Sequence, residues 1–141
     1  MTAPIRVLLV EDNPGDAELT RDTLEAGKLV LDIHVVVDGA EAIDFLLQRG
    51  QHVGAPTPDL VVLDLNLPKR DGREVLQEIR RHAALRTTPV VILTSSDAEK
   101  DIAQGYLLGA NCYITKPVDL AAFQQIVRSI ETFWFTIVRL P

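Results

Sequence analysis

Five short apolar runs, each followed by a segment with apolar residues at helical spacing, constrain the fold of this chain more than any other feature. The runs are residues 5–10, 31–37, 60–65, 89–96 and 111–115. The amphipathic segments begin at 14, span 40–48, 72–82 and about 97–108, and begin again near 119. Strands covered on both faces read as continuous apolar runs, and helices that connect parallel strands provide that cover. The pattern predicts a doubly wound α/β fold, with a five-stranded parallel sheet and five helices.

Composition narrows the class of protein. A length of 141 residues fits one domain, and the chain shows neither an internal repeat nor an interdomain linker. The single cysteine, Cys112, excludes an internal disulfide and a cysteine-based zinc site. A formal net charge of −6 argues against non-specific nucleic-acid binding, and no apolar run approaches the ~20 residues of a membrane span. We expect a soluble, cytoplasmic protein that binds neither nucleic acid nor membrane.

Polar residues occur where the apolar runs end. Glu11 and Asp12 follow the first run, and Asp64 lies near the end of the third. Thr94 falls late in the fourth run, and Lys116 follows the fifth. Functional residues in an open α/β sheet gather at the carboxyl ends of the strands, so we expect these side chains to converge.

The chemistry of this set favours a phosphoryl group. Three neighbouring carboxylates repel one another unless a cation joins them, and hard oxygen ligands select Mg²⁺ or Mn²⁺. A lysine and a hydroxyl at the same edge would stabilise phosphoryl oxygens. Asp64 is the preferred nucleophile because its strand is central in the expected sheet. The alternative is that Asp64 is an ordinary carboxylate at a strand end.

Four motifs, in order, carry a resemblance to a known family. They are LLVEDNPGDAEL (8–19), LVVLDLNLPKRDG (60–72), VVILTSS (90–96) and NCYITKP (111–117). Together they resemble the receiver domain of bacterial two-component response regulators, over about residues 5–130. The resemblance implies a flavodoxin-like strand order 2-1-3-4-5. It also implies that Asp64 accepts a phosphoryl group from the phosphohistidine of a sensor histidine kinase, in a switch rather than an enzyme.

The resemblance implies a metal site as well. Asp12, Asp64 and the backbone carbonyl of Asn66 would bind Mg²⁺ (or Mn²⁺), with Glu11 acting mostly through water.

It further implies how phosphorylation is read. Lys116 would contact the phosphoryl oxygens, and the peptide bond between Lys116 and Pro117 would be cis. Thr94 would move to bond the phosphoryl group, and Tyr113 would swing inward behind it.

The C-terminal segment points to a subfamily. Residues 130–141, the long loop before Asp59 and the NCYITKP string resemble the stand-alone regulators that partner phytochrome-type histidine kinases. These regulators dimerise through the last helix and a C-terminal extension, here residues 131–141 of a single domain spanning 1–141. Phe133, Trp134 and Phe135 make this segment apolar on nearly all sides, which favours a homodimer over folding back on the domain. The signal would then leave through an unidentified downstream protein, either by phosphorylation-dependent protein contact or by phosphotransfer in a phosphorelay.

Two other functions remain as alternatives. An Asp-nucleophile phosphohydrolase resembling the haloacid dehalogenase family would carry Asp-x-Asp after its first strand and a cap domain. Here Glu11 and Asp12 are adjacent, and the chain leaves no room for a cap. A flavodoxin-like FMN carrier would need a phosphate-binding loop after the first strand, which is not evident in the sequence.

Overall fold

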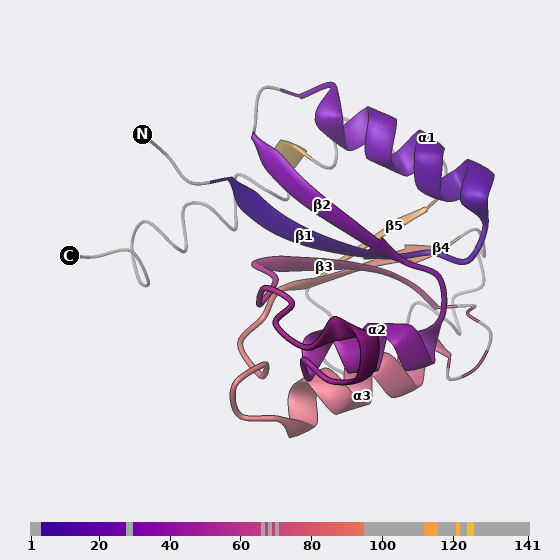
Figure 1. The fold of residues 1–141 in the computed structure, drawn as a ribbon. Helices are drawn as coiled ribbons and strands as arrows, with labels where there is room; N and C mark the ends of the chain where they lie inside the picture. The colour runs from indigo at the N-terminus through magenta and orange to yellow at the C-terminus, as the bar shows by residue number, and fades with distance from the viewer. Residues whose placement is uncertain are drawn as a thin grey trace.

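A parallel β-sheet forms the centre of the molecule (Figure 1). The computed structural model describes residues 4–27, 30–65, 67, 69, 71–94, 112–115, 121 and 124–125. Its strands are β1 (Ile5–Val10), β2 (Leu31–Val36), β3 (Leu60–Asp64), β4 (Val90–Thr94) and β5 (Cys112–Thr115). They pair in the order β2-β1-β3-β4-β5, every pair parallel. The predicted parallel α/β sheet and its 2-1-3-4 order are confirmed, and β5 pairs with β4.

Three α-helices of the described residues cover the two faces of this sheet. Helix α1 (Pro14–Glu25) lies on one face, and α2 (Gly39–Leu46) and α3 (Gly72–Arg81) lie on the other (Figure 1). A short 3₁₀ helix, η1 (Gly50–His52), follows α2. The helix expected at 97–108 lies outside the described residues, as does nearly all of the expected last helix.

Each α-helix begins at a side chain that caps its free backbone N–H groups. Asn13 accepts a hydrogen bond from the Asp16 N–H at 3.0 Å, and Asp38 accepts one from Glu41 at 2.7 Å. Asp71 accepts hydrogen bonds from two backbone N–H groups in the first turn of α3. These caps place all three helix starts directly after the carboxyl end of a strand or the loop that follows it.

The core consists of one apolar layer on each face of the sheet. Leu8 and Val10 of β1 pack with the α2 and α3 side, whereas Val7 and Leu9 pack on the α1 side. Every residue of β3 is buried, because the strand has a neighbour on each edge and helices on both faces. Within the described part of the chain, no helix has the length and apolar character to cross a membrane.

Candidate functional site

Three carboxylates meet at the carboxyl ends of β1 and β3. Glu11 and Asp12 follow β1 directly, and Asp64 is the last residue of β3. One carboxylate oxygen from each residue lies within 4.8 Å of the other two. The strands are adjacent and parallel, with Val10 paired to Leu63, so the next residues of each strand reach the same level of the edge. The sequence-based expectation that these carboxylates converge is confirmed.

Burial divides the cluster into two inner carboxylates and one outer one. Glu11 is 1% exposed and Asp64 is 5% exposed, whereas Asp12 is exposed to solvent. Burying ionised carboxylates side by side is unfavourable unless a positive charge offsets their repulsion. The exposed Asp12 leaves one side of the cluster accessible to solvent. An ion entering from that side would meet two fixed, buried carboxylates.

The backbone fixes the two inner residues. The Glu11 N–H donates to the Val36 carbonyl at 3.0 Å, which continues the pairing of β1 with β2 by one residue. The Asn13 N–H donates to Glu11 Oε2 at 3.3 Å. On the other strand, Asp64 is in register with Leu93 of β4. Both carboxylates are therefore carried by backbone that belongs to the sheet, and not by a free loop.

The donor set fits a hard divalent cation. The cluster offers oxygen ligands only, and magnesium or manganese sites are commonly built from a few carboxylates with water completing the coordination. Helix α1 begins two residues after Asp12, so its positive N-terminal end also lies at this edge. The residues present thus suit Mg²⁺ or Mn²⁺.

The loop between β3 and α3 closes tightly beside Asp64. The Gly72 N–H donates to the Leu65 carbonyl at 3.0 Å, joining the two ends of the loop. Within the loop, Lys69 adopts a positive φ of 52°, and its Nζ lies 3.8 Å from Asp38 Oδ2 at the start of α2. Gly72 was not among the site residues expected from the sequence. The sequence feature that could have indicated its role is a glycine at the first position of a helix, immediately after the capping Asp71.

Two further expected residues lie on described strands. Thr94 is the last residue of β4 and pairs with Thr115, which places its backbone at the same carboxyl edge as Asp64. Tyr113 lies within β5, in register with Ile92. The other expected site residues fall outside the described residues: Asn66, Lys116, Pro117, Phe133, Trp134 and Phe135.

Comparison with known proteins identifies the family. A family model described as the response regulator receiver domain matches residues 7–128. Response regulator Rcp1 of Synechocystis sp. is 43% identical over 138 residues, which cover 98% of this chain and 94% of Rcp1.

Solved structures agree with the sequence match. The Mn²⁺-bound crystal structure of Rcp1 has a TM-score of 0.77, with 98% of this chain and 99% of that one covered. The crystal structure of phosphorylated RcpA, a cyanobacterial phytochrome response regulator, gives 0.79 at 45% identity and 99% coverage of both chains. The bacteriophytochrome response regulator AtBRR gives 0.83 at 43% identity, with 94% of this chain and 96% of that one covered. Together with the acidic cluster at the ends of β1 and β3, these matches show that the chain belongs to the response regulator receiver family.

Proposed function

We propose that this chain is a single-domain response regulator that accepts a phosphoryl group on Asp64 from a phytochrome-type sensor histidine kinase, in a Mg²⁺-dependent reaction. The observation that carries the proposal is the convergence of Glu11, Asp12 and Asp64 within 4.8 Å at one edge of a receiver-family sheet. A receiver of this family is a signalling switch and not a conventional enzyme, which argues against the phosphohydrolase alternative.

The chemical step is a transfer between two nucleophiles. A carboxylate oxygen of Asp64 forms a bond to phosphorus while the bond between phosphorus and the kinase histidine nitrogen breaks, and the imidazole leaves with that electron pair. Asp12, Asp64 and the Asn66 carbonyl would hold the metal, with Glu11 acting mostly through water. When bound, the metal supplies positive charge that offsets the carboxylates and the phosphoryl oxygens.

Readout of the phosphoryl group would use residues on the neighbouring strands. Thr94 and Lys116 would bond the phosphoryl oxygens, the latter preceding a cis bond to Pro117, and Tyr113 would turn inward. The end of β4 at Thr94 is consistent with this role. The new negative charge would thereby shift the population toward a second conformation that a downstream protein recognises.

Full-length similarity supports the choice of kinase. RcpA and AtBRR are response regulators of phytochromes, and they match this chain over 94–99% of its length.

By the same similarity we infer a cytoplasmic protein with one receiver domain over residues 1–141. Its complete fold would be flavodoxin-like, with strand order 2-1-3-4-5 and five helices. Phe133, Trp134 and Phe135 of the 131–141 extension would contribute to a homodimer.

The function is tested by phosphotransfer from a purified, autophosphorylated phytochrome histidine kinase. We expect label to move from the kinase to the wild-type protein, but not to Asp64→Asn and not in the presence of a chelator. Asp59→Asn, the same change at the opposite end of β3, is the control and should be labelled normally. Labelling of Asp64→Asn would overturn the acceptor assignment. Sustained release of phosphate from a small phosphate ester would favour the phosphohydrolase.

The homodimer is tested separately by light scattering. We expect the full chain to be dimeric and a chain ended after Glu131 to be monomeric. Two monomers would contradict the proposed dimer contact without affecting the acceptor site.

A further inference from the structure

The N-terminus of α3 packs directly on the backbone that carries Asp64. Gly72 is the first residue of α3 and is buried. A Cβ at this position would collide with the Asp64 carbonyl oxygen, and it would lie 2.6 Å from Leu65 Cα and 3.1 Å from the Asp64 carbonyl carbon. All three atoms belong to the backbone, so no side-chain rotation can relieve the contact. The start of α3 and the end of β3 therefore meet at a distance that only glycine permits.

The requirement at this position is for space and not for an unusual backbone conformation. The glycines with positive φ in the described chain are Gly50 and Gly54, and Gly72 is not among them. Gly15 offers a useful contrast, because it also lies in the first turn of a helix that starts at this edge. A Cβ on Gly15 would meet only the Asn13 side-chain oxygen, at 3.3 Å. A Cβ at the start of α3 is thus excluded by fixed backbone, whereas a Cβ on Gly15 of α1 needs only a small shift of the Asn13 side chain.

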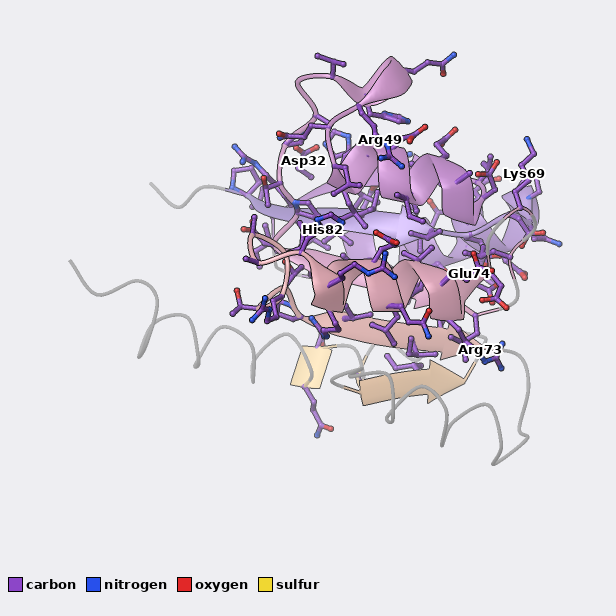
Figure 2. All side chains as sticks on the ribbon, turned by 90° about the horizontal axis from the view of Figure 1, so that it is seen from below. Asp32, Arg49, Lys69, Arg73, Glu74 and His82 are labelled. Carbon is purple, nitrogen blue, oxygen red and sulfur yellow. The ribbon has the colours of Figure 1, made fainter. Side chains whose placement is uncertain are left out.

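Helix α3 is held firmly in this position. Asp71 Oδ1 accepts hydrogen bonds from the Arg73 N–H at 2.9 Å and from the Glu74 N–H at 3.2 Å. Figure 2 shows Arg73 and Glu74 at the same end of the molecule as Lys69, the residue of the preceding loop. Farther along α3, Leu76 and Ile79 are fully buried in the core. A collision at Gly72 would meet a helix anchored at its cap and along its buried face.

The collision is relieved only if the strand end and the start of α3 separate, and because α3 is anchored, part of this movement falls on the strand end. An ordinary van der Waals contact needs 3.4 Å, so Leu65 Cα and a new Cβ would have to separate by about 0.8 Å. The displaced backbone is that of Asp64 and Leu65, one residue from the pairing of Leu63 with Val10 that sets β3 beside β1. A shift of this size would move the Asp64 carboxylate relative to Glu11 and Asp12.

We propose that Gly72 is a positioning residue for the phosphoryl acceptor. Because Gly72 has no side chain, the start of α3 can pack directly on the backbone of Asp64. This packing fixes the acceptor carboxylate within the acidic cluster. This inference rests on the proposed function, because it names a further determinant of the same site. A misplacement near 1 Å at a reacting group lowers rates by roughly 100-fold, so Gly72→Ala should slow phosphorylation by roughly 10- to 100-fold.

The test compares Gly72→Ala with wild type, with Gly15→Ala and with Ile79→Ala. Phosphorylation by acetyl phosphate at saturating Mg²⁺ is followed by intact mass, and each rate is divided by the folded fraction from circular dichroism. Mn²⁺ affinity is measured by calorimetry on the same proteins. Ile79→Ala reports on lost stability, since it creates a cavity in the apolar core and Ile79 is not one of the acidic cluster's residues.

We expect Gly72→Ala alone to lose rate and to bind Mn²⁺ more weakly, with Gly15→Ala and Ile79→Ala within about twofold of wild type. A wild-type rate per folded molecule for Gly72→Ala would overturn the inference, as would an equal loss in Ile79→Ala. If Gly72→Ala needs an osmolyte to fold, the same rates are compared with all four proteins in that osmolyte. A wild type that binds Mn²⁺ but accepts no phosphoryl group would refute the proposed function instead, and Mn²⁺ affinity would still decide the role of Gly72.

Discussion

Replacing Asp64 by asparagine should stabilise the metal-free protein while removing its function. The change deletes one of three clustered negative charges and keeps the shape of the side chain. Glu11 and Asp64 are both buried, and their carboxylate oxygens lie within 4.8 Å. At an effective dielectric constant of about 20, two unit charges at this separation repel by at least about 3.5 kcal/mol. Interactions that favour the Asp64 carboxylate are lost at the same time, so the net gain in unfolding free energy should be about 1–2 kcal/mol.

The assay is thermal unfolding in chelator and in Mg²⁺, followed by circular dichroism. A gain of about 1–2 kcal/mol corresponds to a rise in Tm of about 3–8 °C for a domain of this size. Mg²⁺ should stabilise the wild type by binding the folded state, and it should stabilise Asp64→Asn much less. The difference in Tm between the two proteins should therefore shrink or change sign when the metal is added.

Asp59→Asn is the matched control for this experiment. Asp59 immediately precedes β3, and its Oδ2 accepts a hydrogen bond from the Arg6 N–H at 2.9 Å. Neutralising it weakens that bond without relieving the acidic cluster, so its Tm in chelator should not rise. A lower Tm for Asp64→Asn than for wild type in chelator would refute the reasoning that the carboxylates repel one another in the folded protein.

Three further substitutions test how the surrounding framework is held. Asp71→Ala removes the cap of α3 and should lower the free energy of unfolding by about 1 kcal/mol in urea titration; an unchanged midpoint would mean that the cap contributes nothing. Ile79→Ala empties a fully buried position and should cost about 2–5 kcal/mol by the same method, and a loss below 1 kcal/mol would indicate that the core collapses to fill the space. Burial lowers the pKa of the Arg80 guanidinium, and this group donates hydrogen bonds to the Arg86 and Thr88 carbonyls at 2.9 Å each. Arg80→Met removes both bonds and should lower the free energy of unfolding by about 1–2 kcal/mol, measured by calorimetry. A stability equal to wild type would show that water replaces both bonds.

The acidic cluster was predictable because it depends on strand order alone. Parallel strands end at one edge of a sheet, so Glu11, Asp12 and Asp64 converge wherever β1 and β3 are neighbours. The continuous apolar character of β3 reflects burial on both faces, which made that strand equally easy to recognise. The apolar pattern was sufficient to predict the burial of β3, whereas the strand order that makes β1 and β3 neighbours was implied by the resemblance to receiver domains.

Features that depend on tertiary distances could not be read in advance. Helix α2 was expected over 40–48 but spans Gly39–Leu46, because Gln48 adopts a positive φ of 57° that helical backbone does not allow. The ring centroids of His34 and His52 lie 5.4 Å and 5.2 Å from that of Phe45, and no sequence pattern indicates these contacts. The packing of Gly72 on Asp64 joins residues eight apart in sequence through a distance that no local pattern encodes.

The most direct test of the central claim is the intact mass of the protein after incubation with a small-molecule phosphoryl donor. We predict the addition of one phosphoryl group to the wild type in Mg²⁺, no addition in chelator, and no addition to Asp64→Asn. A folded wild type that gains no mass from an active donor would contradict this claim, as would an equal gain in Asp64→Asn.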